Sequence, residues 1–498
     1  MPGGSVSPPG GIQQVREDTI RELVERRYYS VSDTWRAMFE PENVVIIGAS
    51  ASPGRPGHEI IRNLQANEYG GKIHLVNPKG GEILGLPVTT DIESLPDNID
   101  HAVIIVSAAA TTDMVRRCAA KGIRTYTLAA GGYSEVDEQG EQLQLELEQT
   151  IKELGVRAIG PNTSGNISMP HKFTSSFFPL GWIRPGNISY IAQTGNFATH
   201  TQRYISTGEH YGVARVVGLG NKIDIEESEA LEYLADDDET KAIFLYLESF
   251  KQPRRFMQVA RKASAKKPIF LLKGGTSQEG SQAAIAHTAA LASDSRVVET
   301  AMHQSGITQL TEYSQLFNVA KAISFMPLPR GNRVSFLCPS GAMLVVLTDL
   351  CEQKWGLAVP DLEEVNRQRL QDIGPTWLRM RNPVDIWGPA MVHGIEKAYR
   401  DGIEAVMDDP NIDAVVVVMV LIDEFGRPPL DFLVDMAQKY PDKPLLVSFT
   451  GIKERMDEAK AFLEPRGVPT YPYIEQPFEV LSVLNKARQA MERSQRAA

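Results

Sequence analysis

The stretch from Val44 to Ser50, which reads Val-Val-Ile-Ile-Gly-Ala-Ser, decides the fold class of this chain. Four consecutive apolar residues, the length of a short strand, run directly into glycine and small residues, and a helical stretch begins at about His58. Further apolar runs follow, each separated from the next by a longer polar-faced helical stretch: 73–76, 102–106, 124–128 and 157–159. Strands that are apolar throughout and alternate with helices predict a parallel sheet that is covered on both faces.

The same pattern begins again twice further along the chain. Residues 188–196 read Ile-Ser-Tyr-Ile-Ala-Gln-Thr-Gly-Asn, residues 334–342 read Val-Ser-Phe-Leu-Cys-Pro-Ser-Gly-Ala, and each opens a new series of apolar runs. Pro-rich joints at 178–186 and 326–331 separate the three series. The sequence therefore predicts an α/β protein with three doubly wound parallel-sheet domains. After an N-terminal extension at 1–37, their predicted bounds are 38–180, 181–328 and 329–498.

Length, charge and cysteine content limit what this chain can do. At about 150 residues per domain, 498 residues correspond to about three domains. Lys and Arg total 51 against 62 Asp and Glu, a net charge of −11 without a basic block, which argues against nucleic acid or a membrane as partner. Three cysteines without paired spacing, no metal-ligand spacing, no signal peptide and no run of about 18 apolar residues predict a soluble cytoplasmic protein with neither a disulfide framework nor a metal site.

The loop after the first predicted strand is suited to phosphate. It runs from Gly48 to Gly57, and its glycines allow close approach of the backbone to a ligand at the start of a helix. It lacks the Lys of a Walker A loop, and Lys79 follows the second strand where a dinucleotide site carries an acidic residue. A lysine there suits the 3′-phosphate of coenzyme A or the 2′-phosphate of NADP. A tight turn that binds no ligand is the alternative interpretation.

In the second domain, several reactive groups follow successive strands. Gln193-Thr194-Gly195, a Gly-rich turn at 218–221, Glu248 and 273–275 follow four strands, and His287 comes shortly after the last. The carboxyl ends of parallel strands meet at one edge of a sheet, so a carboxylate, an imidazole and a helix start would gather there. Together these groups are typical of a site that carries a phosphohistidine intermediate. Taken singly, His287 is typical of a surface helix and Glu248 of an ordinary strand end.

The chain resembles a known enzyme family from about Met38 to Ala490. The motifs that carry the resemblance are VVIIGASASPGRPG at 44–57, HLVNPKGGEILGLPV at 74–88, LAAGGYSEV at 128–136, RAIGPNTSG at 157–165, AAIAHTAALA at 283–292 and NPVDIWG at 382–388. In this order they are similar to the α subunit of the nucleoside-diphosphate-forming (ADP-forming) acyl-CoA synthetases, or acetate–CoA ligases, which are related to the succinyl-CoA synthetase α subunit. The resemblance implies a Rossmann-like CoA-binding domain, a ligase domain with a phosphohistidine and a C-terminal flavodoxin-like domain.

The resemblance also implies a role for each candidate site residue. His287 would be phosphorylated, Glu248 would orient it, and Gln193, Thr194 and Gly195 would seat the phosphate. Coenzyme A would lie along Gly48, Ser50, Ala51, Ser52, Pro53, Gly54, Arg55, Lys79, Ala129, Ala130, Gly131 and Asn162. The implied reaction joins a small carboxylic acid to CoA at the expense of ATP, giving acyl-CoA, ADP and phosphate through an acyl phosphate and phospho-His287.

The three domains leave no room for an ATP site. The resemblance therefore implies that ATP or ADP, with Mg, binds to a separate ATP-grasp β subunit, as an α2β2 assembly. Thr163, Ser164 and Asn166 replace less polar residues of the family, which predicts a polar short-chain acid as substrate. Ala286 and Ala289 replace the usual Ser and Gly beside His287.

Two other functions stay open on the sequence. A non-catalytic CoA-binding regulatory protein could keep the fold with altered surroundings of His287. An NADP-dependent oxidoreductase could be built on the first domain, although no site for hydride transfer is recognisable. The acid used, the preference for ADP or GDP and the direction of the reaction are not encoded in any motif.

Overall fold

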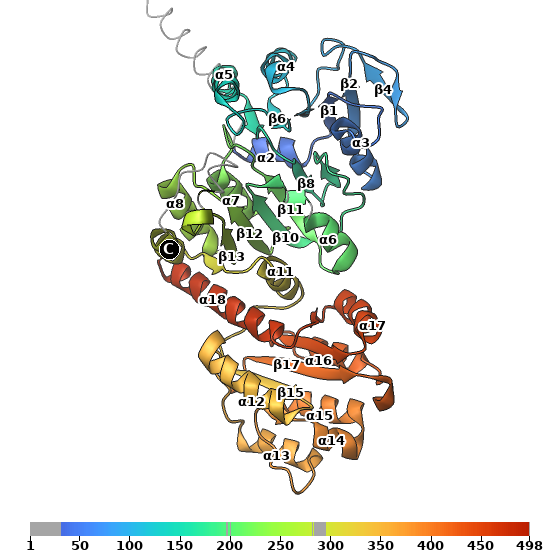
Figure 1. Ribbon diagram of the computed structural model, residues 1–498, viewed down its shortest axis with the longest axis vertical. Helices are drawn as coiled ribbons and strands as arrows, with labels where there is room; N and C mark the ends of the chain where they lie inside the picture. The colour runs from blue at the N-terminus through green and yellow to red at the C-terminus, as the bar shows by residue number, and fades with distance from the viewer. Residues whose placement is uncertain (1–30, 196–197, 200, 281, 283–294, 498) are drawn as a thin grey trace, which may run out of the picture. The chain divides into compact units, whose positions relative to one another are not determined.

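The computed structural model describes residues 31–195, 198–199, 201–280, 282 and 295–497 (Figure 1). The chain divides into two compact units. The first contains Met1–Pro179 together with Gly218–Glu229, and the second contains Leu180–Val217 together with Ala230–Ala498. Each unit is described by itself.

The first unit is built on a twisted sheet with strand order β3-β4-β2-β1-β5-β6-β7. In this sheet, β4, β2, β1, β5, β6 and β7 run parallel to one another, and β3 runs antiparallel to β4. Val45 of β1 pairs with His74 on one side and Ala102 on the other. The strand bounds are β1 (Asn43–Ile47), β2 (Lys72–Val76), β3 (Glu82–Ile83), β4 (Leu86–Thr89), β5 (His101–Ile104), β6 (Thr125–Leu128) and β7 (Arg157–Ile159), with a short hairpin of β8 (Asn166–Ser168) and β9 (Phe173–Thr174).

Helices cover both faces of this sheet (Figure 1). All five residues of β1 are buried, because alternate side chains point into two separate cores. Val45 and Ile47 pack with α4 (Ala108–Ala120) and α5 (Glu138–Leu154), whereas Val44 and Ile46 pack with α3 (Pro56–Ala66). This is the doubly wound arrangement that the uninterrupted apolar runs predict. The remaining described helix of this unit's N-terminal part is α2 (Val31–Phe39).

The second unit contains two further sheets with parallel strands. In the first, the strands lie in the order β14-β13-β12-β10-β11, and in the second in the order β16-β15-β17-β18-β19. Their bounds are β10 (Pro185–Ala192), β11 (Val213–Gly218), β12 (Ala242–Leu247), β13 (Ile269–Lys273), β14 (Thr308–Leu310), β15 (Val334–Cys338), β16 (Val384–Asp385), β17 (Ala414–Leu421), β18 (Leu445–Gly451) and β19 (Thr470–Tyr471).

Helices of the second unit flank both of its sheets. Those of its first sheet are α6 (Thr201–Gly208), α7 (Glu227–Asp236), which begins in the first unit, α8 (Pro253–Ser264), α10 (Ser295–Gln304) and α11 (Gln315–Phe325). Those of its second sheet are α12 (Gly341–Leu350), α13 (Glu364–Ile373), α14 (Trp387–His393), α15 (Ile395–Met407), α16 (Asp431–Lys439) and α17 (Lys453–Leu463).

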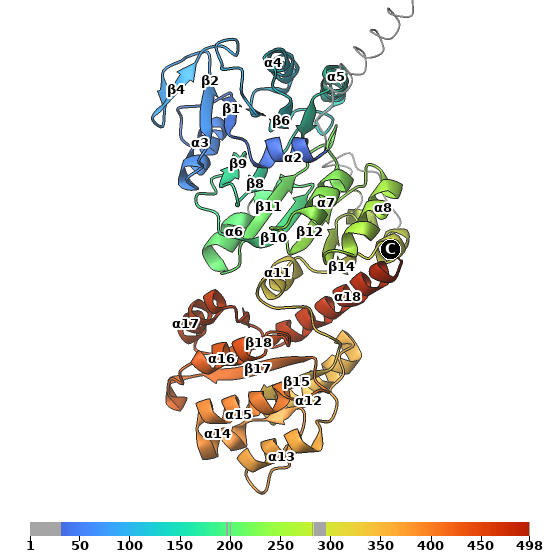
Figure 2. The same ribbon diagram turned by 180° about the vertical axis from the view of Figure 1, so that it is seen from behind.

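The last helix, α18 (Gln476–Ala497), joins the two halves of the second unit (Figure 2). It contacts β17 and β18 near its start and packs on α8 and α11. Near its end, the hydroxyl of Ser494 lies 2.7 Å from that of Ser264. The predicted fold class, doubly wound parallel sheets in Rossmann-like and flavodoxin-like domains, is confirmed. Within the described ranges, no helix is long and apolar enough to span a membrane.

Candidate active site

The predicted CoA loop leaves the carboxyl end of β1 in a conformation that requires glycine. Gly48 has a φ of +94°, and a Cβ there would lie 2.4 Å from the carbonyl oxygen of Ile105. A Cβ on Gly57 would lie 2.2 Å from the carbonyl oxygen of Gly48. The loop therefore lies directly against the first turn of α3, an approach that side chains would prevent.

The tip of this loop is open to a ligand. Residues 51–55 are exposed, and no side chain in the described part of the chain caps α3, which begins after Arg55. The Glu59 carboxylate accepts the N–H of Gly54 at 2.9 Å and pairs with Arg62 at 2.5 Å, so its charge is compensated. An exposed arginine beside an uncapped helix start suits an anionic group such as phosphate.

The other predicted CoA residues lie at the same edge of the sheet. Lys79 is exposed in the turn after β2, and Asn77 ties this turn to the first loop through a bond of 2.8 Å from its side-chain amide to the Ala49 carbonyl. Asn77 Oδ1 accepts the main-chain N–H of Lys79 at 2.8 Å. The order β2-β1-β5-β6-β7 places the ends of β1, β2, β6 and β7 along one edge, so the structure brings these segments together.

Residues after β6 and β7 complete this edge. Ala129 is buried and Gly131 is exposed, and the N–H of Asn162 donates to the Ala130 carbonyl at 2.9 Å. Asn162 has a φ of +58° and an exposed side chain whose Oδ1 would lie 3.1 Å from a Cβ on Gly131. The segment after β6 and the segment after β7 therefore form one continuous surface.

A carboxylate not identified from the sequence holds this surface. Glu135 accepts the N–H of Gly132 at 2.7 Å with one oxygen and the side-chain amide of Asn221 at 2.8 Å with the other. Burial alone would raise the pKa of Glu135, but the hydrogen bonds from Asn221 and the main chain outweigh it and lower that pKa. Glu135 belongs to the LAAGGYSEV motif, which pointed to this segment. The sequence could not show its role, because its partner Asn221 lies 86 residues away.

The polar segment 163–166 is mostly engaged inside the protein. Thr163 is buried, and its hydroxyl donates to the Gly218 carbonyl at 2.5 Å. Asn166 is fully buried, and its Oδ1 accepts the N–H of Gly218 at 3.3 Å. Both side chains thus fix the residue at which β11 ends. The polar acid predicted from this segment stays a prediction, since only Asn162 presents an exposed polar side chain here.

In the second unit, the side chain of Gln193 fixes the turn after β12. Its Oε1 accepts the N–H groups of Glu248 at 2.9 Å and Ser249 at 3.0 Å, and its Nε2 donates to the Ser249 hydroxyl at 3.0 Å. Its main-chain N–H donates to the Tyr246 carbonyl at 3.0 Å. Gln193, the first residue of the predicted phosphate seat, therefore holds the backbone of the site in place. The other two residues of the seat, Thr194 and Gly195, are half-buried beside it.

Glu248 is a buried carboxylate with one oxygen unused. Its side chain is only 8 % exposed, and Oε1 accepts the Tyr246 hydroxyl at 3.3 Å. Oε2 is buried and has no hydrogen-bond partner among the described residues. A buried carboxylate oxygen normally has a donor, so this atom indicates a missing one. His287, the predicted donor, lies outside the described residues.

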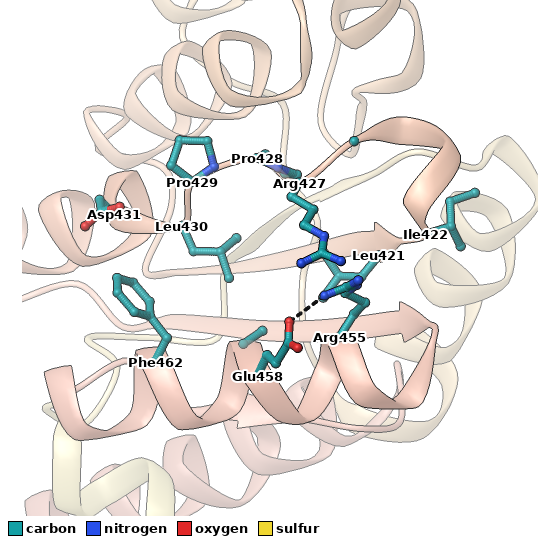
Figure 3. Close-up of a pocket in the computed structure, with 12 residues that line it drawn as sticks. Leu421, Ile422, Arg427, Pro428, Pro429, Leu430, Asp431, Arg455, Glu458 and Phe462 are labelled. Atoms are coloured by element: carbon teal, nitrogen blue, oxygen red, sulfur yellow. Dashed lines mark hydrogen bonds and ion pairs between the residues drawn. The ribbon is translucent and has the colours of Figure 1, made fainter.

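Two of the cavities beside the second sheet of this unit contain no predicted site residue. One, of about 300 Å³, is lined by apolar Leu421, Leu430 and Phe462 with Arg427 and Arg455 (Figure 3). Arg455 donates to Glu458 at 2.8 Å, which compensates its charge. The other, of about 650 Å³, lies beside Gly341 and Asp385.

The cysteines are excluded as nucleophiles. All three are buried free thiols. Burial raises the pKa of Cys118 and Cys351 to about 12 and that of Cys338 to about 11, so the thiolate is not populated at neutral pH. In the described part of the chain, no three His, Cys, Asp or Glu side chains gather as a metal site.

Comparison with known proteins identifies the family. Residues 42–168 match a CoA binding domain, and residues 185–323 match a succinyl-CoA ligase like flavodoxin domain. The chain is 35% identical over 463 residues to acetate–CoA ligase (ADP-forming) II of Archaeoglobus fulgidus, covering 92% of this chain and 67% of that protein. It is 33% identical over 458 residues to the α subunit of acetate–CoA ligase (ADP-forming) I of Pyrococcus furiosus, covering 90% of this chain and 97% of that subunit.

A solved structure agrees with these relatives. Acetyl-CoA synthetase 1 of Candidatus Korarchaeum cryptofilum, described as dinucleotide forming and in complex with phosphate and ADP, superposes with a TM-score of 0.86 at 28% identity. The match covers 93% of this chain and 99% of that one. These matches support a ligase and not a non-catalytic CoA-binding regulator. The chain belongs to the family of ADP-forming acetate–CoA ligases.

Proposed function

We propose that this chain is the CoA-binding, phosphohistidine-bearing subunit of an ADP-forming acid–CoA ligase. The reaction joins a carboxylic acid, CoA and ATP into acyl-CoA, ADP and phosphate. The observation that carries the proposal is the buried Glu248 carboxylate at the end of β12. Gln193 fixes the main chain of Glu248, and Glu248 Oε2 has no hydrogen-bond partner among the described residues. Such an oxygen suits the N–H of an imidazole, and His287 follows the neighbouring strand in the sequence.

Different residues of this chain bind CoA, orient the histidine and bind the phosphoryl group. The exposed tip at 51–55, the uncapped start of α3 and Lys79 supply positive charge and free N–H groups for the phosphates of CoA. Glu248 Oε2 accepts the N–H of one ring nitrogen of His287, which fixes the tautomer and leaves the lone pair of the other nitrogen for the phosphoryl group. Thr194 and Gly195, which are half-buried beside Gln193, supply main-chain N–H groups for the phosphoryl oxygens.

The binding site for ATP or ADP is assigned to a partner subunit. The chain covers 97% of the Pyrococcus α subunit but 67% of the Archaeoglobus ligase, which is a longer single chain. A separate ATP-grasp β subunit that binds ATP and Mg, in an α2β2 assembly in the cytoplasm, accounts for the difference. Ligase activity of this chain in the absence of any partner would refute the division.

The experiment that tests the function is phosphorylation of the assembled enzyme. Incubation with γ-labelled ATP should give acid-labile, base-stable phosphate on this chain, and His287→Asn should abolish it. His303→Asn is the matched control, because His303 is an exposed histidine of the same unit. Undiminished labelling of His287→Asn would contradict the proposal.

A further inference from the structure

Tyr246 and Glu248 lie two residues apart at the end of β12, so their side chains share one face of the sheet. The Tyr246 hydroxyl donates to Glu248 Oε1 at 3.3 Å. Burial and the nearby Glu248 carboxylate raise the pKa of Tyr246 to about 12. The hydroxyl therefore keeps its proton at neutral pH and acts as a permanent donor.

The main chain that carries Glu248 is held from two sides. The Gln193 side chain accepts the N–H of Glu248 from β10, the neighbouring strand. From β13 on the other side, the Lys273 ammonium donates to the Glu248 carbonyl at 2.8 Å and also to the carbonyl of Gly274. With the backbone fixed, the rotation of the carboxylate is the remaining freedom at this residue.

Gly274 provides the space for this pair. A Cβ at position 274 would lie 2.8 Å from the Tyr246 hydroxyl oxygen and 3.2 Å from Cγ of Glu248. The first distance is too short for real atoms, so a side chain there would displace the hydroxyl, the carboxylate or both. The glycine and the tyrosine thus act on the same carboxylate.

We propose that Tyr246 is a positioning residue for phosphoryl transfer: its hydroxyl holds Oε1 of Glu248 so that Oε2 alone is presented to the histidine. The inference rests on the proposed function. A carboxylate with one fixed oxygen offers a single acceptor direction, whereas one with two free oxygens can rotate and accept the imidazole N–H in several orientations. In this role Tyr246 acts through Glu248.

The test is Tyr246→Phe in the full chain, assembled with its partner subunit, with the rate of histidine phosphorylation measured per folded enzyme. Loss of one hydrogen bond to a charged group lowers this rate by about tenfold at saturating ATP, with the KM for ATP unchanged. The loss appears in kcat of the folded enzyme, because the carboxylate is misoriented while the nucleotide site is unchanged. A purely structural role would lower the amount of folded enzyme and leave the kcat of the folded fraction at the wild-type value.

Two further variants make the result decisive. Tyr190→Phe is the matched control, since Tyr190 is a buried tyrosine of the same unit whose hydroxyl lies 3.2 Å from that of Tyr211. It should keep the wild-type rate. Gly274→Ala disturbs the same hydrogen bond while the Tyr246 hydroxyl stays in the chain, because the added Cβ lies 2.8 Å from the hydroxyl oxygen and 3.2 Å from Cγ of Glu248. It should reproduce the slow rate even where Tyr246→Phe fails to fold.

The outcomes separate this inference from the proposed function. If Glu248→Gln and His287→Asn are impaired while Tyr246→Phe keeps the wild-type rate, the positioning role is overturned and the proposed function stands. A Tyr246→Phe variant whose lower rate comes only from a smaller folded fraction also counts against the role. If His287→Asn is still phosphorylated, the proposed function itself fails.

Discussion

Lys79 is the residue that we propose for the 3′-phosphate of CoA at the edge of the first sheet. It is exposed in the turn that Asn77 ties to the loop after β1, so its ammonium is available beside that loop. If it binds the 3′-phosphate, Lys79→Ala weakens CoA binding by about tenfold, the value expected for one charge-assisted contact. Dephospho-CoA, which lacks that phosphate, should bind wild type and variant equally. Titration calorimetry of the full chain measures both.

The control for this experiment is Lys72→Ala. Lys72 is also exposed but begins β2, at the opposite end of the strand from the turn that contains Lys79. It should leave CoA and dephospho-CoA affinities unchanged. An equal loss for both ligands in Lys79→Ala would place the lysine elsewhere on the nucleotide.

Residue types at strand ends could be predicted from sequence, but their contacts could not. Gln193 and Glu248 follow apolar runs, and the parallel sheet places both at one edge, where they bond. Tyr246 stands within the apolar run of β12, and nothing in such a run distinguishes a core tyrosine from one whose hydroxyl holds a carboxylate. That distinction depends on Gly274, which leaves the space.

At the scale of elements, a buried ion cluster joins the end of α6 and α11 to the segment after α17. Glu464 is fully buried and contacts His210 at 2.9 Å and Lys321 at 3.0 Å. Lys321 also pairs with Glu209 at 3.2 Å. Burial opposes ionisation of Glu464, but the hydrogen bond from His210 and the charges of Lys321 and Lys460 outweigh it and lower the pKa to about 2.

The shift predicts a pH dependence of stability with a definite sign. The folded-state pKa lies below the ordinary value of 4.5, so Glu464 stabilises the fold above pH 4.5 and loses this contribution as the pH falls toward 2. The contribution at neutral pH is about 3 kcal/mol. Glu464→Gln should therefore lower the free energy of unfolding at pH 7 and flatten its decline between pH 4.5 and 2. Denaturant unfolding at a series of pH values measures both.

Glu475→Gln is the control for this prediction, because Glu475 is exposed. Its unfolding curves should follow wild type at every pH. A Glu464→Gln variant with the wild-type acid slope would mean that another carboxylate governs acid unfolding.

Long apolar runs predicted the main strands to within a few residues, but short elements were not predicted. The run 242–247 coincides with β12, and 414–420 with all but the last residue of β17. The hairpin of β8 and β9 and the two-residue strand β16 have no run of their own. Strands of two or three residues are defined by their partners and not by local hydrophobic pattern.

At the scale of the whole molecule, the first unit is discontinuous in sequence. The predicted boundary at 180 follows a Pro-rich joint, but contacts draw Gly218–Glu229 into the first unit. Arg157, at the start of β7, pairs with Asp224 at 3.0 Å and Glu229 at 2.9 Å. In the sequence this segment resembles an acidic surface run, because Arg157, the partner of Asp224 and Glu229, lies more than 60 residues earlier.

This discontinuity predicts which fragments of the chain can fold. Residues 218–229 also complete main-chain bonds, since the N–H of Ile223 donates to Gly160 at 3.2 Å and that of Ile225 to Ala158 at 3.2 Å. A fragment ending at residue 179 leaves Arg157 half-buried without its two carboxylates and the edge of β7 unpaired, which costs several kcal/mol. It should bind CoA weakly and melt well below the full chain.

Asp224→Asn in the full chain tests the same point without truncation. It keeps the shape of the side chain and its bond to the Ala158 N–H, which Asp224 accepts at 2.8 Å, but removes the charge that faces Arg157. Loss of a half-buried ion pair should lower the melting temperature by several degrees. It should also weaken CoA binding, because a shift of β7 would move Asn162, which follows three residues after the strand. Asp238→Asn, in the exposed acidic run after α7, is the matched control and should change neither. The contrary outcome is a fragment 1–179 that binds CoA as tightly as the full chain, with Asp224→Asn melting at the wild-type temperature. In that case the segment 218–229 is not needed for folding of the first unit, and the predicted boundary at 180 is correct.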